Sequence, residues 1–408
     1  MSTAERALQL DMRILIVSSY FPPDICPAAT RAGELSRHLA ASGGEVTVLT
    51  CNPRYPRGFD FPAPLSKHRS YGWHGVQVEE FAVPAANESP PRQAVEELRF
   101  YARGLKAARR LSAPDVVIAT SPFFSAACLG WRLARLWRRP FIYDMRDLYP
   151  DILRFRRLPL PPTLYPYLKG WANRLYRDTS VIVVNQPSLL HTLSGFVDPS
   201  RLRMVMNPVS LPAGPAQRRP GVRSPLTVGY AGRWGRGYDF PALLSTIDHV
   251  DPSGFTFRLI GGGYWDEEVR RFAAGIRPNL SVHYGWLAPE QLAVDYASWD
   301  IAILPVEPRW CLSMWPAKIP ELVAHGIVTV ISRELPLPPA LATCRFIVQA
   351  RESNAEGYAT ALEEAGARVR TLTPEDYAFA SETMRREFDP VRLAAAYSEV
   401  IRLVLAEK

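Results

Sequence analysis

Residues 13–50 read RILIVSSYFPPDICPAATRAGELSRHLAASGGEVTVLT and contain one complete structural unit. The unit opens with RILIVSS (13–19), a short apolar run ending in small polar residues, as expected of a buried parallel strand. AATRAGELSRHLAAS (28–42) has apolar residues on one helical face, and two glycines stop it before a second strand, EVTVLT (45–50). Strand, helix and strand make a βαβ unit, which predicts an α/β fold.

The same alternation continues to residue 207. Further strands are predicted at 115–120, 141–147, 180–186 and 203–207, with helices at 123–138, 162–177 and 188–194. Residues 208–225 have no periodicity and are rich in Pro, Gly and Arg, which is typical of a linker. Beyond the linker the predicted strands are 226–232, 255–263, 281–286, 300–306 and 327–333, and the predicted helices are 240–250, 356–368, 375–387 and 390–406.

We therefore predict an α/β chain of two facing Rossmann-like, doubly wound parallel-sheet domains. The expected bounds are 1–207 for the first domain, 208–225 for the linker, 226–388 for the second domain, and 389–408 for a final helix that packs back on the first domain. Ligands of such sheets bind beyond the carboxyl ends of the strands, so the cleft between the domains is the expected site.

Composition excludes several other classes of protein. The chain has 408 residues, of which 47% are hydrophobic and 22% charged, and this apolar content is too high for a disordered protein. No apolar run reaches the roughly 18–20 residues that span a bilayer, and the N-terminus lacks a signal-peptide pattern, so a cytoplasmic protein is expected. The five cysteines and seven histidines are scattered without metal-site spacing, so we expect neither a disulfide framework nor a bound metal.

Positive charge is concentrated in the first half of the chain. Residues 1–205 hold 27 Lys and Arg against 17 Asp and Glu, whereas residues 206–408 hold 21 against 23. RFYARGLKAARRL (99–111) and WRLARLWRRP (131–140) mix arginine with apolar residues at helical spacing. A solvated helix explains this pattern about as well as a helix on anionic lipid. The excess positive charge favours the second interpretation, peripheral contact with an anionic membrane at the inner face of the cell membrane. No nucleic-acid-binding module is recognisable, so nucleic acid is not an expected partner.

Two glycine-containing loops of the second half follow buried strands. YAGRWGRGYDF (230–240) places Arg233 and Arg236 after Gly232, where arginine could bind phosphate and a solvated turn is the alternative. LIGGGYWDEE (259–268) could make room for a diphosphate or simply turn the chain.

SMWPAKIPELVAHGIVTVI (313–331) runs from an aromatic-rich loop into a short helix and a β-branched strand. Backbone N–H groups of residues 314–318 at the helix start, together with Lys318, would form an anion site. Glu321, one turn in, could hold a ribose diol, and helix-end electrostatics is its alternative.

Together these stretches resemble the GT-B glycosyltransferases, specifically glycosyltransferase family 4. PAKIPELVAHGIVTVI is similar to that family's donor-site helix and strand. SSYFPPDICPAATRAGELSRHLAASGGEVTVLTCNPRYPRG (18–58) is similar to the subgroup that makes O-antigen and colanic-acid polysaccharides, and so is FIYDMRDLYPDIL (141–153), with Tyr149 at a tryptophan position.

The resemblance implies roles for individual residues. Glu321 corresponds to the second of the family's paired glutamates, which binds the donor ribose, and Arg233 and Arg236 correspond to the pair that neutralises the donor diphosphate. Ser313 stands where the family has the first of these glutamates. That glutamate normally contacts the hydroxyls of the donor sugar, so the identity of the sugar is left open by this replacement. The full donor set implied is Gly232, Arg233, Arg236, Gly262, Gly263, Trp286, Ser313, Met314, Trp315, Pro316, Ala317, Lys318 and Glu321.

Arg233, Arg236 and Lys318 would stabilise the leaving group, and the first domain would hold the acceptor. The acceptor-side set is Cys26, Ala28, Arg31, Ser121, Arg146 and Asp147; Cys26 replaces a usual glycine, and Asp147 is also a candidate catalytic residue. Asp144 is a further candidate contact to the acceptor, with turn chemistry as its alternative.

The implied function is a retaining, hexosyltransferase-type transfer from a nucleotide sugar, expected to be a UDP-sugar, to a glycan, lipid-linked or small-molecule acceptor in polysaccharide biosynthesis. The nucleotide sugar is a co-substrate and no cofactor is expected. A sugar-nucleotide epimerase of the same fold, or a non-catalytic nucleotide-sugar-binding protein, remains open.

Overall fold

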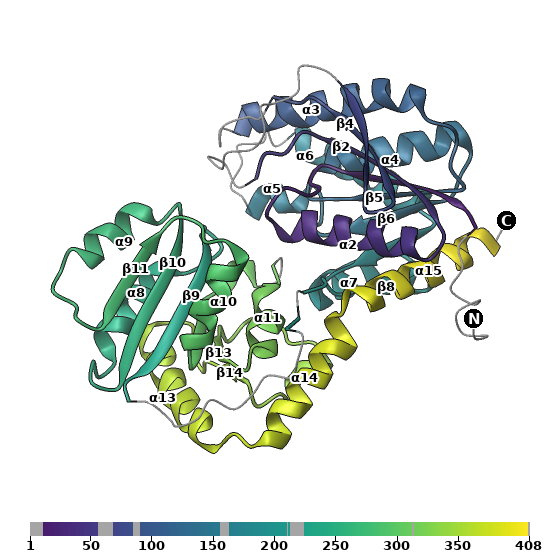
Figure 1. Cartoon of the computed structure of the whole chain (residues 1–408). Coiled ribbons are helices and arrows are strands. Elements are labelled where there is room, and N and C mark those ends of the chain that lie inside the picture. Colours follow the sequence, from purple (N-terminus) through teal and green to yellow (C-terminus); the bar gives the residue numbers. More distant parts are fainter. Residues whose placement is uncertain are drawn as a thin grey trace. The chain divides into compact units, whose positions relative to one another are not determined.

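The computed structural model describes residues 11–55, 68–84, 90–155, 163–209, 211–212, 224–311 and 314–406. The chain divides into two compact units (Figure 1). Unit 1 comprises Met1–Pro208 together with Pro390–Lys408, and unit 2 comprises Val209–Asp389. The end of the chain therefore returns to complete the unit in which the chain began.

Unit 1 is built on an eight-stranded sheet with the order β3-β4-β2-β1-β5-β6-β7-β8. Its strands are β1 (Arg13–Ser18), β2 (Glu45–Cys51), β3 (Arg69–Trp73), β4 (Val76–Phe81), β5 (Val116–Thr120), β6 (Phe141–Met145), β7 (Val181–Val184) and β8 (Leu202–Met204). All neighbouring pairs are parallel except β3 and β4, which are antiparallel. The quoted stretch 13–50 supplies the two central strands β1 and β2, which pair from Arg13 opposite Glu45.

Helices cover both faces of this sheet. The helices of the unit are α2 (Pro27–Ala41), α3 (Pro90–Ala107), α4 (Phe124–Trp137), α5 (Asp151–Phe155), α6 (Leu164–Asp178), α7 (Pro187–Ser194) and α15 (Pro390–Ala406). One core contains residues of α3, α4, α6 and α7, and the other contains residues of α2 and α15. Because successive strand residues point to opposite faces, Leu15 and Val17 enter the first core while Ile14 and Ile16 enter the second.

Helix α15 belongs to unit 1 although it follows unit 2 in the sequence. Leu393, Tyr397 and Val404 are buried in the same core as Ile14 and Leu39, and α15 packs beside α2. Burying a Leu- or Val-sized side chain contributes about 1.5–3 kcal/mol, so the apolar face of α15 secures the end of the chain to this unit.

The hairpin of β3 and β4 was missed by the sequence analysis. His74 and Gly75 join the two strands, and both have positive φ angles, 46° and 80°. Two successive residues with positive φ are the mark of a type I′ hairpin turn, for which Asn-Gly is the usual signal and His-Gly a weaker one.

Unit 2 contains a six-stranded sheet in the order β11-β10-β9-β12-β13-β14, and every pair is parallel. Its strands are β9 (Leu226–Trp234), β10 (Phe255–Gly263), β11 (Leu280–Tyr284), β12 (Ile301–Leu304), β13 (Val328–Ile331) and β14 (Ile347–Gln349). Its helices are α8 (Phe240–His249), α9 (Asp266–Ala273), α10 (Pro289–Ser298), α11 (Lys318–Ala324), α12 (Pro339–Ala342), α13 (Ala355–Thr371) and α14 (Pro374–Phe388). Helix α13 packs against α8 and β13, and α11 packs against α14.

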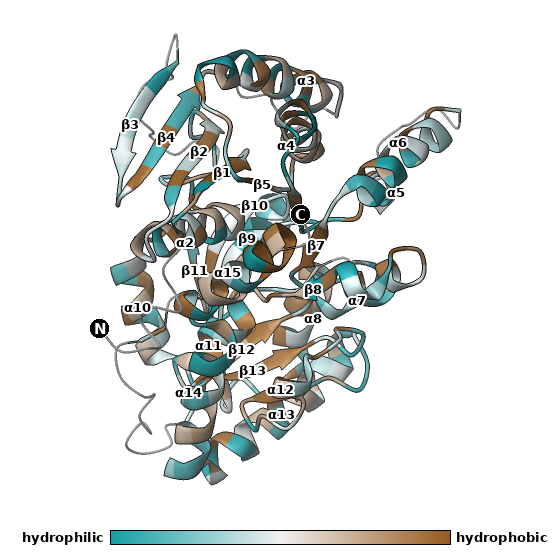
Figure 2. Cartoon of the chain, turned by 90° about the vertical axis from the view of Figure 1, so that its right-hand side faces the viewer, coloured by the Kyte–Doolittle hydropathy of each residue, from teal (hydrophilic) through white to brown (hydrophobic). Residues whose placement is uncertain are grey.

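The predicted α/β class with two Rossmann-like sheets is confirmed. The expected linker at 208–225 lies mostly outside the described residues. Figure 2 shows the physical basis of the strand predictions, since the central strands are largely brown while the helices carry both colours.

Candidate functional site

Helix α11 carries the first candidate group. It begins at Lys318, runs for seven residues and leads through Gly326, with a φ of 72°, into β13. Ala317 caps the helix without a side-chain hydrogen bond, and Glu321 lies in its first turn. The helix dipole favours a carboxylate at this position, and the opening backbone N–H groups have no partner inside the helix.

Tyr296 links the two charged residues of α11. The Tyr296 hydroxyl donates to Glu321 Oε1 at 3.2 Å, and Lys318 Nζ donates to the Tyr296 oxygen at 3.3 Å. Lys318 Nζ also lies 3.9 Å from Glu321 Oε2. Burial, and then the charge of Glu321, raise the pKa of Tyr296 well above its ordinary value, so the phenol stays neutral and keeps its proton for Glu321. Lys318, Tyr296 and Glu321 are called the α11 cluster below.

The α11 cluster remains accessible from outside the fold. Lys318 and Glu321 expose 26% and 28% of their side chains, whereas Tyr296 is buried. The Lys318 ammonium and the Glu321 carboxylate, both hydrogen-bonded to the Tyr296 hydroxyl, are thus accessible to a ligand. The sequence analysis missed Tyr296, because a lone tyrosine near the end of α10 gives no local signal of a role.

Gly232 provides the space for the Lys318 side chain. A Cβ atom at this position would lie 2.8 Å from Lys318 Cε, and the φ of Gly232 is 141°. Any other residue would therefore displace Lys318 and strain the backbone. The end of β9 and the start of α11 are in this way brought into contact at the carboxyl end of the sheet.

Arg233, in the last part of β9, and Arg236, two residues beyond the strand, are both exposed. Arg236 stacks on the ring of Tyr264, with its guanidinium carbon 4.3 Å from the ring centre. Such a cation–π contact holds the guanidinium in a fixed position while leaving its N–H groups available. Arg233 follows Gly232 directly, and its carbonyl oxygen accepts from the Tyr230 hydroxyl at 2.8 Å.

Close packing against β9 explains two of the three glycines that end β10. A Cβ at Gly261 would lie 1.9 Å from the Gly232 carbonyl oxygen, and one at Gly263 would lie 2.9 Å from that of Trp234. The Gly263 N–H donates to Asp266 Oδ1 at 2.6 Å, so an acidic side chain already occupies the turn. The simpler interpretation of a chain turn accounts for Gly261 and Gly263 without a ligand.

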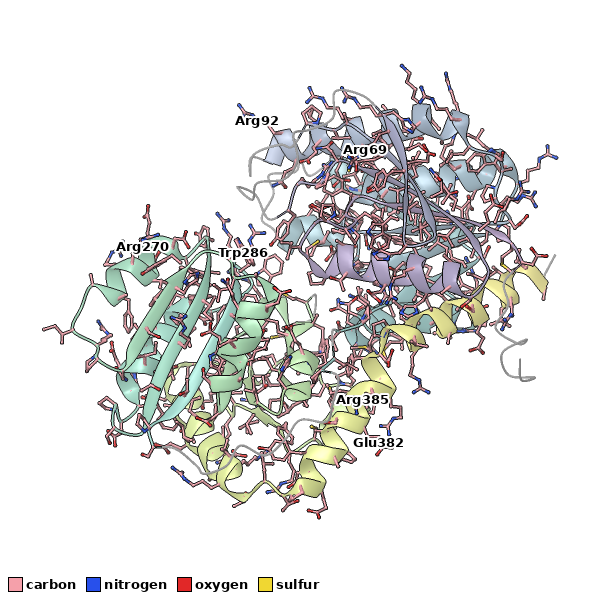
Figure 3. The ribbon with its side chains drawn as sticks, in the orientation of Figure 1. Arg69, Arg92, Arg270, Trp286, Glu382 and Arg385 are labelled. Atoms are coloured by element: carbon pink, nitrogen blue, oxygen red, sulfur yellow. The ribbon has the colours of Figure 1, made fainter. Side chains whose placement is uncertain are left out.

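The remaining donor candidates differ in accessibility. Trp286 lies two residues after the end of β11 and is 40% exposed, and Figure 3 labels it on the outside of the unit. Trp315 is buried: its ring stacks on Phe388 at 5.8 Å and its indole N–H donates to Pro336 O at 3.1 Å. The structure therefore corrects the assignment of the Trp315 side chain to donor binding, because this indole is used in the packing of unit 2.

The loop before α11 contributes fewer N–H groups than the sequence suggested. The Met314 N–H donates to Trp310 O at 2.8 Å, and Pro316 has no N–H group. The backbone N–H groups of Ala317 and Lys318 remain at the start of the helix. Ser313, the position of the missing glutamate, lies outside the described residues.

The acceptor-side candidates gather at the carboxyl ends of the strands of unit 1. Cys26 is the N-cap residue of α2, Ala28 is buried in its first turn, and Ser121 follows β5. Ser121 Oγ accepts from the Arg146 N–H at 2.9 Å, which joins the ends of β5 and β6. Asp147 is half-buried beside Arg146.

Arg31 is a structural residue, which corrects its assignment to acceptor binding. It is buried, and its Nε and Nη2 atoms each donate to a carboxylate oxygen of Asp144 at 2.9 Å. Its Nη1 donates to Met206 O at 2.8 Å, and Nη2 also approaches the Tyr397 hydroxyl at 3.2 Å. Burial alone raises the pKa of Asp144, but the Arg31 guanidinium outweighs it and holds that pKa below its usual value.

This pair joins four segments of unit 1, including α15 through Tyr397. Asp144 is fully engaged by Arg31 and is not a free contact for an acceptor. Tyr397 was missed by the sequence analysis because its partners are more than 250 residues away in the chain.

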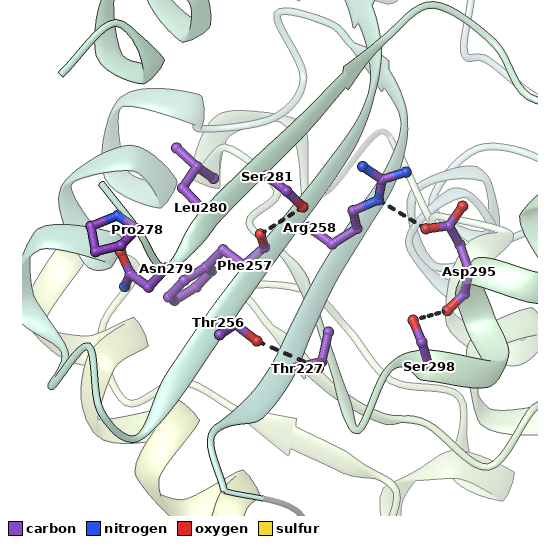
Figure 4. Close-up of a pocket in the computed structure, with 10 residues that line it drawn as sticks. All are labelled: Thr227, Thr256, Phe257, Arg258, Pro278, Asn279, Leu280, Ser281, Asp295 and Ser298. Carbon is purple, nitrogen blue, oxygen red and sulfur yellow. Dashed lines mark hydrogen bonds and ion pairs between the residues drawn. The ribbon is translucent and has the colours of Figure 1, made fainter. Parts of the chain in front are cut away.

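A separate hollow of about 350 Å³ lies in unit 2 (Figure 4). It is lined by residues from the beginnings of β9, β10 and β11 and from the end of α10, and Arg258 within it pairs with Asp295 at 2.9 Å. These are the amino ends of the strands, whereas Lys318 packs against Gly232 near the carboxyl end of β9.

Within the described ranges, no three His, Cys, Asp or Glu side chains come together as metal ligands. None of the helices described is long and apolar enough to cross a membrane.

Comparison with known proteins gives a family match for the first part of the chain. Residues 28–210 match the family model of the glycosyl transferase 4-like domain. Searching the curated proteins by sequence gave no match.

Solved structures similar to the whole chain are GT-B glycosyltransferases. Sucrose-phosphate synthase from Thermosynechococcus elongatus is 16% identical, with a TM-score of 0.69 over 97% of this chain and 100% of that one. HepE from Anabaena, in complex with UDP and glucose, is 14% identical with a TM-score of 0.64 over 96% and 99%. The catalytic domain of starch synthase IV from Arabidopsis thaliana, bound to ADP and acarbose, is 12% identical with a TM-score of 0.65 over 97% and 100%.

The expected resemblance to GT-B glycosyltransferases is thereby confirmed, and the chain has the GT-B fold. At these identities the solved structures establish the fold alone. The resemblance to the O-antigen and colanic-acid subgroup stays a prediction.

Proposed function

We propose that the protein is a retaining, hexosyltransferase-type glycosyltransferase that uses a nucleotide sugar, expected to be a UDP-sugar. The observation that carries the proposal is the α11 cluster beside the carboxyl end of β9, with Arg233 in the last part of that strand and Arg236 just after it. Arg233, Arg236 and Lys318 suit a diphosphate, and the half-exposed carboxylate of Glu321 suits the hydroxyls of a ribose. A nucleotide diphosphate presents both of these groups within one molecule.

The chemistry follows from the charge that develops on the leaving group. As the bond between the sugar C1 and the diphosphate oxygen breaks, negative charge grows on the diphosphate, and Lys318 and the two arginines stabilise it. A preorganised donor of this kind contributes roughly 3–4 kcal/mol to the transition state. In the retaining reaction the acceptor oxygen bonds to C1 on the face that the diphosphate leaves, and its proton passes to a phosphate oxygen.

The nature of the donor is supported as a class by the similar structures. HepE is described with UDP and glucose, and starch synthase IV with ADP. We expect uridine here from the resemblance to polysaccharide-making enzymes, with a glycan, a lipid-linked sugar or a small molecule as the acceptor.

Incubating the purified full-length protein with radiolabelled UDP-sugars and a membrane extract tests this function. Transfer of label to lipid or glycan is expected, and Lys318→Gln should reduce the transfer rate by about 100-fold or more. Glu382→Gln, an exposed change on α14, is the matched control (Figure 3). Formation of an epimer without transfer would instead indicate the epimerase, and binding without either reaction would indicate a non-catalytic protein.

We also propose that unit 1 contacts an anionic membrane through α3, α4 and α6, which lie side by side on one face of its sheet. Exposed apolar side chains stand among cations on these helices: Leu98 is 69% and Tyr167 74% exposed. The exposed cations of α3 and the turn after it are Arg92, Arg99, Arg103, Lys106, Arg109 and Arg110. Among the exposed described residues of the three helices the one acid is Asp178, which pairs with Arg135 at 3.2 Å.

The chemistry of this face matches a lipid surface. Each Lys or Arg near an anionic bilayer contributes about 1 kcal/mol, and apolar side chains add to that by entering the interface. Figure 2 shows hydrophilic and hydrophobic residues interleaved along α3 and α6. Such contact would place the protein at the cytoplasmic face of the cell membrane.

Sedimentation with vesicles tests this contact. The protein should pellet with vesicles containing anionic lipid at low salt and remain in solution with neutral vesicles. Leu98→Glu should reduce the bound fraction several-fold, whereas Leu403→Glu, at an exposed position on α15, should not. Equal binding of neutral and anionic vesicles, or none at low salt, would rule the contact out.

A further inference from the structure

An aromatic pair at the turn between β10 and α9 contacts the loop that carries Arg236. The rings of Tyr264 and Trp265 stand edge to face, with their centres 4.9 Å apart. The guanidinium carbon of Arg236 lies 4.3 Å from the centre of the Tyr264 ring. Because Arg236 is itself exposed, the ring supports its guanidinium while the N–H groups stay accessible to a ligand.

Trp265 holds the backbone on both sides of Arg236. Its indole N–H points at two carbonyl oxygens, those of Gly235 and Tyr238, and each lies 3.2 Å away. The Tyr238 N–H donates to the Gly235 oxygen at 3.0 Å, which closes these four residues into a turn. One side chain thereby fixes both ends of the turn that presents Arg236.

Further contacts hold the same turn against the segments that follow β12. The Glu307 N–H donates to Gly237 O at 3.0 Å. A Cβ atom at Gly237 would lie 3.1 Å from Met314 Cε, so the Met314 side chain packs directly on the turn. With the backbone held in this way, rotation within the turn is left to the Arg236 side chain, and Tyr264 restrains it.

The aromatic pair has a fixed base of its own. The Trp265 N–H donates to Trp234 O at 3.3 Å, which ties the pair to the end of β9. On the other side of Tyr264 in the chain, the Gly263 N–H donates to Asp266 Oδ1 at 2.6 Å. Tyr264 therefore lies between two anchored residues and can hold an arginine in place.

We propose that Tyr264 and Trp265 are positioning residues that hold Arg236 ready for the diphosphate of the donor. The inference rests on the proposed transferase function and adds how one of its cations is preorganised. A free arginine side chain loses rotamer entropy when it binds a ligand, whereas one already held on an aromatic ring loses less. Because negative charge grows on the diphosphate as the sugar leaves, a preorganised Arg236 stabilises the transition state more than the bound donor.

A double-mutant cycle tests whether Tyr264 acts through Arg236. Tyr264→Leu should weaken UDP binding to the full-length protein about two- to fivefold in calorimetry, as expected from the loss of an exposed cation–π contact. Tyr264→Phe, which keeps the ring, should retain most of the affinity. In an Arg236→Gln background, Tyr264→Leu should have no further effect. An equal loss in both backgrounds, or no loss in either, would overturn the proposal.

Trp265→Phe tests the second half of the pair, because it keeps an aromatic ring and removes the indole N–H. UDP affinity should again fall a few-fold, and this loss should also vanish in the Arg236→Gln background. In the radiolabelled transfer assay, Tyr264→Leu and Trp265→Phe should lower kcat at least as much as they raise KM. A rise in KM with kcat unchanged would contradict a role in the transition state.

A second cation–π pair in unit 2 provides the matched control. The guanidinium carbon of Arg277 lies 3.6 Å from the centre of the Phe272 ring on α9. Phe272→Leu removes this contact and should leave UDP affinity and kcat unchanged. If it weakened UDP binding as much as Tyr264→Leu, a general disturbance of unit 2 would explain both results, and the proposal would be wrong.

Pyrophosphate separates this inference from the proposed function, because it has neither base nor sugar. If UDP fails to bind the wild type, the proposed donor fails, and pyrophosphate titrated through the same cycle then tests the positioning by itself. Coupling between Tyr264→Leu and Arg236→Gln in pyrophosphate binding would support the positioning role. Absence of coupling with both UDP and pyrophosphate would overturn it.

Discussion

The two sheets of this protein present charge at the carboxyl ends of their strands in different ways. In unit 2, Lys318 and Glu321 are half-buried, and the phenol of Tyr296 joins them. In unit 1, Arg31 and Asp144 are buried against each other, with side-chain exposures of 1% and 2%. The comparison teaches that pairing and burial, rather than residue type, separate a charge that supports the fold from one that is available to a ligand.

The largest effect is expected from breaking the buried pair of unit 1. Arg31→Met leaves the Asp144 carboxylate buried without its partner, which should reduce the free energy of unfolding by about 3–5 kcal/mol. Urea unfolding of the full-length protein followed by circular dichroism measures this. An unfolding midpoint like that of the wild type would mean that Arg31 and Asp144 do not stabilise unit 1.

A smaller effect is expected from the corresponding change in unit 2. Glu321→Gln removes the carboxylate proposed to hold the ribose and should weaken UDP binding about tenfold, or ~1.4 kcal/mol. Calorimetry with UDP measures the affinity, and Glu382→Gln serves as the control. Unchanged affinity in a folded Glu321→Gln protein would remove Glu321 from its proposed role.

The pH dependence of stability should reveal the contribution of the buried Asp144 carboxylate in unit 1. Because the pKa of Asp144 is lower in the folded protein, its contribution to stability is present above the unfolded value of roughly 3.9 and is lost as the pH falls through the folded value. Each unit of lowering corresponds to about 1.4 kcal/mol. Urea midpoints at pH 5 and pH 3 should therefore differ more in the wild type than in Asp144→Asn, and equal differences would contradict this.

The smallest effect is expected from the hydroxyl within the α11 cluster. Tyr296→Phe removes the bonds to Lys318 and Glu321 but keeps the ring, so UDP affinity should fall about threefold, within the ~0.5–1.5 kcal/mol of a typical hydrogen bond. Tyr358→Phe removes a buried hydroxyl bonded to Ser332 and should leave UDP affinity unchanged. Equal effects of the two changes on UDP affinity would show that the Tyr296 hydroxyl does not organise the site.

The elements that the sequence predicted best are those with a strong local pattern. Residues 13–50 produce β1, α2 and β2 within a residue or two of the expected bounds, because apolar runs and glycine stops are local signals. The same holds for α11 and β13, where Glu321 and Lys318 stand near each other in the chain. The hairpin of β3 and β4 was overlooked because a His-Gly turn is a weak signal.

By itself, the sequence determined the alternation of strands and helices, the excess of positive charge in its first half and the helix start that carries Lys318 and Glu321. These features follow from the composition and the local spacing of residues, which can be read from the sequence directly. Only the tertiary structure decided which charges meet: Tyr296 joins Lys318 to Glu321, Trp315 turns into the core, and Arg31 pairs with Asp144. Pairing of this kind depends on contacts between residues far apart in the chain, and no local pattern encodes them.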